Sequence, residues 1–417
     1  MRTLSDLTAS DLQNRRLLVR LDYNVPLDGN GEVSDRTRID ATIPSIERLR
    51  RAGARVLLVS HLGRPGGQRA PSSSLRPIAA ELSRTLGTPV PLLEDLPGTK
   101  ALEAAVAALR PGEVALLENI RFHPGETRND PDLCRSLADL ADAFVGDAFG
   151  AAHRTHASTV GAARVIRDRG GPVVAGVLMA RELHFLDRAL RTPGRPFVAI
   201  MGGAKISGKI DVIRAILPRV DRLLVGGAMA NTFLRALGFE TGASFVEEDR
   251  VPMARDLMEE AGDKLLLPVD CVVADELTPA DRTRDVDRAE LPSGVKIGDI
   301  GPRSREIFSR EASRAATVLW NGPLGVFEIA PFSRGTFHLA RSLAEAADRG
   351  AVVVVGGGDS AAAAQRAGVA HRMTHISTGG GASLDLLAGK ELPGVAVLDT
   401  VEAPDHSELW SDGVIGG

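Results

Sequence analysis

The sequence predicts an α/β protein of two doubly wound parallel-sheet, Rossmann-like lobes, each a three-layer αβα sandwich, joined by a long interdomain helix. Three observations lead to this fold class. Short apolar runs typical of buried strands recur along the chain, segments with helical periodicity separate them, and the strands fall into two groups with a long helical stretch between. Strands that alternate with helices favour parallel sheets covered on both faces.

The predicted strands are apolar runs of three to seven residues, and such short runs are typical of strands buried on both sides. They span Arg16–Leu21, Ala54–Ser60, Val114–Leu117, Ala143–Val145, Phe197–Met201, Arg222–Val225, Ala316–Leu319, Ala351–Val355 and Val395–Leu398. The predicted helices span Thr42–Ala52, Leu75–Leu86, Val212–Arg219, Thr232–Leu237, Gly335–Ala346 and Ser360–Ala367.

The domain boundaries follow from the gap between the two groups of strands. Val177–Leu190 has apolar residues at helical spacing and precedes the breaker Thr192-Pro193-Gly194. We therefore expect four parts. They are an N-terminal domain over 1–175, a connecting helix over 176–192, a C-terminal domain over 193–394, and a segment over 395–417 that packs back on the N-terminal lobe.

Composition narrows the class of protein. The 417 residues are 44% apolar and 25% charged, with a net charge of −4, so nucleic acid and anionic membranes are not indicated as partners. Cys134 and Cys271 lie too far apart for a CxxC zinc motif, and two cysteines cannot form a disulfide framework. No run of 18 apolar residues occurs, and we expect a cytoplasmic protein.

Arginine and histidine follow the predicted strands of the N-terminal half. In open α/β sheets, ligands bind outside the carboxyl ends of the strands. The relevant segments are Asp22-Tyr23-Asn24 with Arg38 beyond it, His61-Leu62-Gly63-Arg64, Glu118-Asn119-Ile120-Arg121, and Asp147-Ala148-Phe149-Gly150 followed by His153-Arg154.

Any one of these arginines could belong to an ordinary surface ion pair. Four at matched strand ends repel one another unless an anion lies between them, and the planar guanidinium binds carboxylate and phosphate in a bidentate manner. The pattern predicts a small ligand with both groups. His153 and His156 have HxxH spacing but lack a third ligand, so we expect hydrogen bonding near the anion rather than a metal site.

Glycine and lysine follow the strands of the C-terminal half. Gly203, Gly208 and Lys209 nearly satisfy a P-loop pattern, but Ile210 stands where the hydroxyl ligand of magnesium is required. Only six of the 50 basic residues are lysine, yet Lys205 and Lys209 lie in this one segment. Glycine allows the backbone to approach phosphates, and lysine supplies positive charge, so a nucleotide is expected here.

Further glycine turns follow strands at Gly226-Gly227, at Gly356-Gly357-Gly358-Asp359-Ser360 and at Gly379-Gly380-Gly381. They could be plain tight turns, but glycine triplets that open a helix also direct free N–H groups toward a phosphate. Asp359 could cap a helix or hold magnesium. Glu328, in the loop after Trp320-Asn321, could bind a ribose hydroxyl.

Eight segments in order along the chain resemble phosphoglycerate kinase. They are Arg-Leu-Asp-Tyr-Asn-Val-Pro at 20–26, Ser-His-Leu-Gly-Arg-Pro at 60–65, Leu-Glu-Asn-Ile-Arg-Phe at 117–122, Asp-Ala-Phe-Gly at 147–150, Gly-Gly-Ala-Lys at 202–205, Trp-Asn-Gly-Pro at 320–323, Gly-Gly-Gly-Asp at 356–359 and Ser-Thr-Gly-Gly-Gly-Ala at 377–382. The resemblance implies transfer of a phosphoryl group between ATP and 3-phosphoglycerate, which gives 1,3-bisphosphoglycerate and ADP. It also implies a monomer in most members.

The resemblance implies a role for individual residues. The acid would be bound in the N-terminal domain by Asp22, Tyr23, Asn24, Arg38, His61, Leu62, Gly63, Arg64, Arg121 and Arg154. The nucleotide would be bound in the C-terminal domain by Lys205, Lys209, Gly298, Asn321, Glu328, Gly357, Gly358, Asp359 and Ser360, with Mg²⁺ on Asp359. Arg38, Lys205, Gly358 and Gly381 would act on the phosphoryl group in transfer.

Three positions depart from the family pattern. Tyr23 replaces a phenylalanine, Gly208 replaces an aspartate, and Lys296-Ile297 replace residues that are often tryptophan or methionine before Gly298. Because the nucleophile is an ionised carboxylate, no general base is needed, and catalysis would rest on positioning and charge stabilisation after domain closure. The alternatives are a kinase for a different carboxylic acid and a non-catalytic anion-binding protein.

Overall fold

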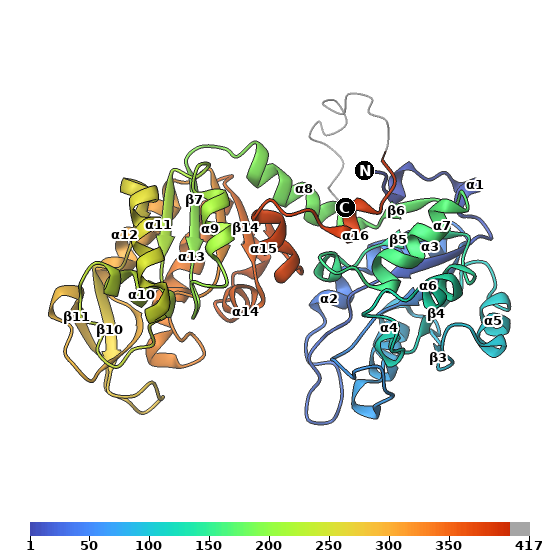
Figure 1. Ribbon diagram of the computed structural model, residues 1–417, viewed down its shortest axis with the longest axis horizontal. Coiled ribbons are helices and arrows are strands. Elements are labelled where there is room, and N and C mark those ends of the chain that lie inside the picture. Colours follow the sequence, from blue (N-terminus) through green and yellow to red (C-terminus); the bar gives the residue numbers. More distant parts are fainter. Residues whose placement is uncertain (401–417) are drawn as a thin grey trace. The chain divides into compact units, whose positions relative to one another are not determined.

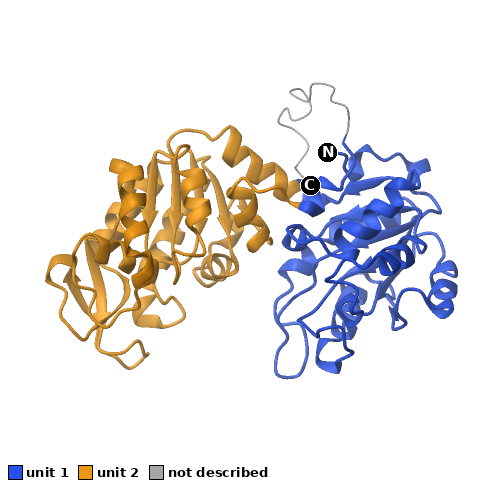
Figure 2. Cartoon of the chain, in the orientation of Figure 1, with its two compact units in different colours: residues 1–180, 393–417 blue, residues 181–392 orange. Residues whose placement is uncertain are grey.

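The computed structural model describes residues 1–400, which divide into two compact units. Unit 1 contains residues 1–180 and the chain from Pro393 onward, and unit 2 contains Arg181–Leu392 (Figure 2). The division falls inside helix α8 (Val177–Arg191). No helix in the described residues is both long and apolar enough to cross a membrane.

Unit 1 is built on a six-stranded sheet of order β3-β4-β2-β1-β5-β6, in which every pair is parallel. Its strands are β1 (Arg16–Arg20), β2 (Arg55–Val59), β3 (Leu92–Leu93), β4 (Val114–Leu117), β5 (Ala143–Gly146) and β6 (Val173–Ala175). The central strands are buried on both faces, as expected for a parallel sheet between two helical layers.

Most helices of unit 1 connect these strands, while α1 precedes β1 and α16 comes near the end of the chain (Figure 1). They are α1 (Ala9–Leu12), α2 (Thr37–Asp40), α3 (Ile43–Arg51), α4 (Arg76–Leu86), α5 (Lys100–Ala107), α6 (Pro131–Ala138), α7 (Ala162–Asp168) and α16 (Pro393–Ala396). A hydrophobic core forms where α3 and α4 pack on one face of the sheet, and it includes Leu17, Val19, Ile46 and Leu82.

Unit 2 repeats the plan with a sheet of order β15-β14-β13-β7-β8-β9, again with parallel pairs. Its strands are β7 (Phe197–Met201), β8 (Arg222–Val225), β9 (Leu265–Leu266), β13 (Thr317–Asn321), β14 (Val352–Gly356) and β15 (His375–Ile376). A separate antiparallel sheet contains β10 (Asp270–Ala274) between β11 (Arg284–Asp287) and β12 (Lys296–Ile300).

The remaining helices belong to unit 2. They are α9 (Ile210–Ile216), α10 (Ala228–Ala236), α11 (Val251–Ala261), α12 (Pro302–Arg314), α13 (Arg334–Asp348), α14 (Gly358–Arg366) and α15 (Gly381–Leu387). The main core of the unit places Trp320, Val353 and Val355 of the sheet against Phe308, Leu339 and Leu343 of α12 and α13.

The α/β class with two parallel sheets is confirmed, and one predicted strand is wrong. The segment predicted as strand Val395–Leu398 contains the end of helix α16 instead, since Pro393 occupies its first position and pre-sets the helical φ. After it, Asp399 accepts from the backbone N–H of Val173 at 2.9 Å within unit 1. The rest of the predicted terminal segment, 401–417, lies outside the described residues.

Candidate active site

Each parallel sheet has one point where the direction of strand succession reverses, and ligands of such sheets bind there beyond the carboxyl ends. In unit 1 the reversal falls between β1 and β5, which are adjacent strands. The segment from Asp22 to Asn24 follows β1, and the segment with His153 and Arg154 follows β5. The topology therefore brings the predicted anion-binding segments to one edge.

Arg38 lies on α2 and reaches back to the end of β1. Its guanidinium donates to Asp22 Oδ2 at 2.8 Å and to the Asn24 carbonyl at 3.4 Å. Asn24 in turn accepts from the backbone N–H of Gly63 at 2.9 Å, which ties the loop after β1 to the loop after β2. Asp22 is buried while Arg38 is about half-buried, so the arginine is oriented without being removed from solvent.

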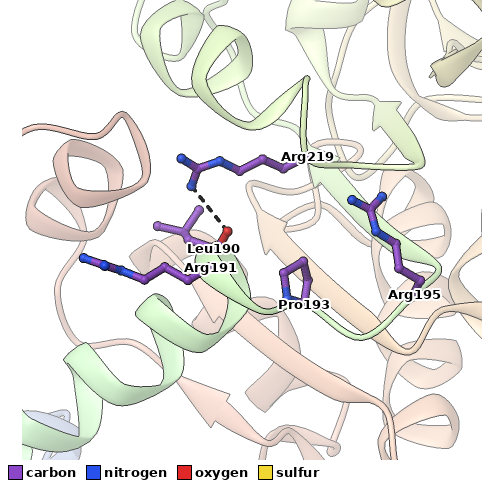
Figure 3. Close-up of a pocket in the computed structure, with 5 residues that line it drawn as sticks. All are labelled: Leu190, Arg191, Pro193, Arg195 and Arg219. Atoms are coloured by element: carbon purple, nitrogen blue, oxygen red, sulfur yellow. Dashed lines mark hydrogen bonds between the residues drawn. The ribbon is translucent and has the colours of Figure 1, made fainter. Parts of the chain in front are cut away.

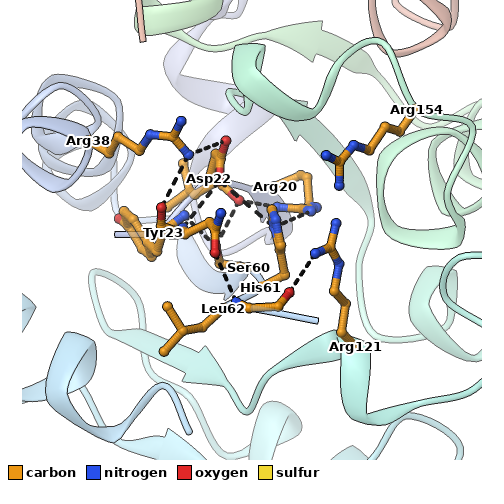
Figure 4. A network of polar contacts seen from close by, with 12 residues as sticks. Arg20, Asp22, Tyr23, Arg38, Ser60, His61, Leu62, Arg121 and Arg154 are labelled. Atoms are coloured by element: carbon orange, nitrogen blue, oxygen red, sulfur yellow. Dashed lines mark hydrogen bonds and ion pairs between the residues drawn. The ribbon is translucent and has the colours of Figure 1, made fainter. Parts of the chain in front are cut away.

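His61 is the second residue after β2 and is buried. Its Nδ1 lies 3.2 Å from a terminal nitrogen of Arg20 and 3.8 Å from Asp22 Oδ1 (Figure 4). Burial and then the positive charges of Arg20 and Arg121 hold the pKa of His61 well below its usual value. The imidazole is therefore neutral at physiological pH.

Arg121 and Arg154 approach the same place from the loops after β4 and β5, and their side chains point toward one another (Figure 4). Arg121 is buried and donates to the Gly63 carbonyl at 2.6 Å, while its Nε has no hydrogen-bond partner in the described residues. Burial, then Arg154 and Arg20, lower the pKa of Arg121 to about 10. An anion bound beside Arg121 would offset the unfavourable burial of its charge next to two other arginines.

Arg20 was missed at the sequence level because it lies inside an apolar strand run. It is 1% exposed at the last position of β1, directly beside the predicted anion site. A charged residue within a buried strand was the available signal, since such residues are rarely buried without a partner. Glu126 and Ser158, which lie near Arg20, were missed as well.

Not every predicted residue of unit 1 presents its side chain to this site. The Tyr23 ring lies in the hydrophobic core, and its hydroxyl pairs with Thr42 Oγ1 at 2.9 Å. The Leu62 side chain is buried too, and its carbonyl accepts from Asn119 at 2.7 Å. Arg64 is exposed.

His153 and His156 lie beside charged groups of unit 1. No group of three or more histidine, cysteine or acidic residues suited to a metal is found in residues 1–400. His153 accepts from Arg154 Nε at 3.2 Å, and His156 Nδ1 lies 3.8 Å from buried Glu126. Burial and the neighbouring arginines lower the pKa of His156 to about 4.

A cavity of about 580 Å³ opens at the corresponding edge of unit 2, next to the reversal between β7 and β13. Its lining includes Gly203, Gly227, Gly298, Glu328 and Asp359. Apolar walls with a few polar groups and this volume suit a ligand the size of a nucleotide. All five of these residues belong to segments that the sequence predicted for the nucleotide.

Lys209 lies where β7 and β13 end. Its Nζ donates to the carbonyls of Gly202 and Asn321 at 2.5 and 2.9 Å. Burial lowers the pKa of Lys209 to about 8, while Asp359 acts in the opposite direction. The two strand ends touch here, because a Cβ added to Gly202 would lie 2.0 Å from the Pro323 carbonyl oxygen.

Two glycine turns open helices without a side-chain cap. Gly357, with a φ of +90°, precedes α14, and Gly380 precedes α15. Gly358, Asp359 and Gly381 are exposed in the first turns of these helices. Their backbone N–H groups are therefore available to an anion, which the positive end of a helix favours.

Two other predicted residues of unit 2, Asn321 and Ser360, are not among those that line this cavity, whereas Gly298 and Glu328 are. Ser360 is fully buried and accepts from the Gly322 N–H at 2.6 Å, whereas the Asn321 side-chain amide has no hydrogen-bond partner in the described residues. Gly298 packs directly on Phe332, which a Cβ would approach to 2.2 Å. Glu328 is exposed. These contacts place Asn321 and Ser360 at the ends of the central strands.

A buried carboxylate that the sequence did not indicate lies in the cavity wall. Asp299 is 2% exposed and accepts from the N–H groups of Gly335 and Ile300 at 2.6 and 2.9 Å. Burial raises the pKa of Asp299 to about 7, and the two hydrogen bonds oppose that rise only in part. Asp299 thus joins the end of β12 to the start of α13.

Lys205 and Gly208 lie in the loop after β7. Lys205 is exposed. Glu247 accepts from the backbone N–H groups of Ile206 and Ser207 at 2.6 and 3.2 Å, so it holds the middle of the loop. A Cβ at Gly208 would have no neighbour within 4 Å, and nothing in the structure requires glycine there.

A second pocket, of about 330 Å³, lies in unit 2 at the end of α8 (Figure 3). Three of its five lining residues are arginines, but each already has an acceptor. Arg219 donates to the Leu190 carbonyl at 3.4 Å, Arg195 pairs with Asp221 at 2.6 Å, and Arg191 pairs with Asp187 at 2.5 Å. This pocket is separate from the cavity beside β7 and β13.

Comparison with known proteins yields consistent relatives. The family profile described as phosphoglycerate kinase matches residues 6–390. The phosphoglycerate kinase of Synechococcus elongatus is 51% identical over 401 residues, which cover 95% of this chain and 98% of that one. That of Chloroflexus aggregans is 50% identical over 397 residues, with 94% and 98% covered.

Solved structures give the same result. Phosphoglycerate kinase from Coxiella burnetii aligns with a TM-score of 0.83 at 39% identity, covering 95% of this chain and 98% of that chain. Phosphoglycerate kinase from Pyrococcus horikoshii aligns with a TM-score of 0.82 at 32% identity, with the same coverage.

Proposed function

The chain belongs to the phosphoglycerate kinase family, and from this premise we propose how its residues divide the two substrates between unit 1 and unit 2. It is a phosphotransferase that moves a phosphoryl group between ATP and the carboxylate of 3-phosphoglycerate. A kinase for another carboxylic acid and a non-catalytic anion-binding protein are not favoured by these relatives.

Unit 1 binds the phosphoglycerate. The observation that supports this most is the group formed by Arg20, Arg38, Arg121 and Arg154. After burial, all four lower the pKa of His61, and Arg154 and Arg20 also lower that of Arg121. Asp22 and Glu126 are the acids that act on this group, and they leave an excess of positive charge. A ligand with a phosphate at one end and a carboxylate at the other matches that excess.

Individual contacts follow from the position of each side chain. Arg121, Arg154 and Arg64 bind the phosphate end, and Asp22, Asn24 and His61 bind the hydroxyl and carboxylate region. Tyr23, Leu62 and Gly63 contribute through their backbone, because the Tyr23 and Leu62 side chains are buried. Arg38 faces the carboxylate that receives the phosphoryl group.

Unit 2 binds the nucleotide. The cavity beside β7 and β13 accepts the base and ribose, with Gly298 in its wall and Glu328 at the ribose. Lys209 and the turn from Gly357 to Ser360 accept the phosphates, and Asn321 supports the turn. When phosphates are present, Lys209 exchanges its two carbonyl partners for their oxygens, which compensates its buried charge better.

Magnesium fits at Asp359. This carboxylate is exposed beside the uncapped first turn of α14, so it can coordinate a cation that the nucleotide phosphates also hold. The nucleotide phosphates would supply further oxygen ligands to such an ion. The ion, when bound, neutralises charge on the phosphates during transfer.

The transfer is direct and needs no proton. A carboxylate oxygen of phosphoglycerate forms a bond to the γ-phosphorus as the bond to the bridging β,γ-oxygen breaks, and ADP leaves with that electron pair. Arg38, Lys205 and the backbone N–H groups of Gly358 and Gly381 stabilise the charge of the phosphoryl group. Because these groups come from different units, the two ligands must be brought together during turnover.

We also infer that the chain acts as a cytoplasmic monomer. All proposed contacts come from a single chain, and Cys134 and Cys271 are both buried free thiols, as is usual in a reducing compartment. Light scattering during size-exclusion chromatography is expected to give the mass of one chain. The mass of a dimer would contradict this.

A coupled assay tests the proposed substrate. With Mg-ATP and 3-phosphoglycerate, the protein should form an acyl phosphate, which a coupling dehydrogenase then consumes. Glycerate and acetate should give no such turnover. Glycerate lacks the phosphate that Arg121 and Arg154 bind, so it is the matched control. Equal rates with glycerate and 3-phosphoglycerate would contradict the assigned phosphate contacts.

A further inference from the structure

Arg20 has no place among the substrate contacts assigned above, although it is the most deeply buried arginine near them. It is 1% exposed, and all three of its guanidinium nitrogens have partners. Nε donates to Ser158 Oγ at 2.8 Å, one terminal nitrogen donates to the Leu21 carbonyl, and the other lies 3.2 Å from His61 Nδ1. Figure 4 shows this last contact beside Asp22.

Ser158 and Glu126 hold Arg20 in this orientation. Glu126 is fully buried and accepts from the Ser158 hydroxyl at 2.6 Å and from the Ser158 N–H at 2.9 Å. Because the Ser158 hydroxyl hydrogen is used by Glu126, its oxygen is left to accept from Arg20. A buried carboxylate thus compensates a buried guanidinium through one hydroxyl group.

In the contact between Arg20 and His61, Arg20 must be the hydrogen-bond donor. A guanidinium has five N–H donors and no acceptor, so Nδ1 of His61 must be the unprotonated nitrogen. In a neutral imidazole the proton then belongs to Nε2. Nε2 has no hydrogen-bond partner in residues 1–400. It is not fully buried, so it still reaches solvent.

We propose that Arg20 is a positioning residue: held by Ser158 and Glu126, it fixes His61 as the Nε2–H tautomer, so that Nε2 donates a hydrogen bond to the anionic substrate. The substrate contact rests on the proposed function, whereas the tautomer does not. A histidine free to exchange tautomers would present Nε2 as an acceptor part of the time, and an acceptor repels an anion. Arg20 removes that state.

Nitrogen NMR of the full chain labelled with ¹⁵N-histidine measures the tautomer directly. The chain has 9 histidines, and the resonances that disappear in His61→Gln identify this ring. In the wild-type protein without substrate, Nδ1 of His61 is expected to resonate as an unprotonated nitrogen and Nε2 as a protonated one. A protonated Nδ1, or averaged signals for the two nitrogens, would overturn the proposal.

Variants then separate positioning from folding. Arg20→Met alone leaves Glu126 buried without a cation, so the double variant Arg20→Met/Glu126→Gln removes both charges. Ser158→Ala keeps both charges but removes the acceptor of Arg20 Nε. Both are expected to mix the His61 tautomers, the double variant more. Arg16→Met is the matched control, since Arg16 begins the same strand and pairs with Asp142 at 2.6 Å instead.

Kinetics give the second readout. The double variant should raise KM for 3-phosphoglycerate about tenfold, the usual effect of losing one hydrogen bond to a charged group, with kcat and KM for ATP little changed. Should the double variant not fold, Ser158→Ala decides: mixed tautomers support the proposal, and an unchanged spectrum overturns it. Suppose that the wild-type tautomer is as stated but His61→Gln leaves KM for phosphoglycerate unchanged. The proposed substrate contact is then refuted, while the conclusion that Arg20 fixes the tautomer of His61 is retained.

Discussion

The anion site of unit 1 and the nucleotide site of unit 2 occupy the same place in two sheets of the same kind, yet they are built from different parts of the chain. In unit 1, long charged side chains converge, and buried partners such as Asp22 and Asn119 orient them or the loops that carry them. In unit 2, the cavity is lined in part by glycines that bring the backbone to its surface, at Gly203, Gly227 and Gly298. One site depends on which side chains are present and the other on which are absent.

This difference indicates how each site should fail. Truncation of a side chain in unit 1 removes charge but leaves the backbone in place. In unit 2 the addition of a single methyl group forces the strand ends apart. The four predictions below test this contrast, from the largest expected effect to the smallest.

Gly202→Ala should damage unit 2 more than any truncation damages unit 1. The added Cβ would lie 2.0 Å from the Pro323 carbonyl oxygen, a backbone atom that cannot turn away. We expect the free energy of unfolding to fall by about 3 kcal/mol or more, with loss of nucleotide binding. Denaturant unfolding and ADP titration measure both.

Gly208→Ala is the matched control in the same loop. Its Cβ has no neighbour within 4 Å, so stability and nucleotide binding should stay near wild type. Equal damage from the two substitutions would show that the loop is sensitive for a reason other than packing.

Arg38→Ala should lower kcat about 100-fold or more, because it removes a preorganised charge from the transferring phosphoryl group. The loss should fall on kcat rather than on KM for ATP. Unchanged turnover would refute the role assigned to Arg38. Arg36→Ala, two residues earlier and paired with Asp40 and Glu81, is the control that should retain activity.

Lys209 should make nucleotide binding depend on pH. Its pKa is lowered to about 8 by burial, so the ammonium that binds phosphate is lost as the pH rises through that value. Between pH 7 and pH 9 the apparent KM for ATP should rise about tenfold, in proportion to the protonated fraction. In Lys209→Arg the rise should vanish, since guanidinium stays charged. If KM for ATP still rises with pH in Lys209→Arg, the titration of another group causes the pH dependence.

Tyr23→Phe should have the smallest effect and only on stability. The hydroxyl pairs with Thr42 in the core, so its removal should cost about 1 kcal/mol of unfolding free energy. KM for 3-phosphoglycerate should not change. A clear rise in that KM would show that the Tyr23 side chain contributes to substrate binding.

Much of the fold could be predicted because apolar runs mark buried strands. The runs Val114–Leu117, Phe197–Met201 and Arg222–Val225 coincide with β4, β7 and β8. The antiparallel strands β11 and β12 could not be recognised, because charged and partly exposed residues interrupt their apolar pattern. Val395–Leu398 failed because a short apolar run has no periodicity that separates strand from helix.

At the candidate sites, the sequence indicated residues that follow strands but not the residues that support them. Arg38, His61 and Arg121 could be identified from their place after apolar runs. Glu126 and Ser158 could not, since they act through Arg20, and only the fold brings positions 20, 126 and 158 together. Asp299 was missed for the same reason: its partner Gly335 lies 36 residues away.

Calorimetric titration of Arg121→Ala with each ligand alone tests the central division most directly. Arg121 is buried in unit 1 and donates to Gly63 there, and it is not among the residues that line the cavity of unit 2. The account predicts that 3-phosphoglycerate binds at least about tenfold more weakly while the affinity for ADP stays at the wild-type value. Weakened ADP binding with unchanged phosphoglycerate binding would contradict it.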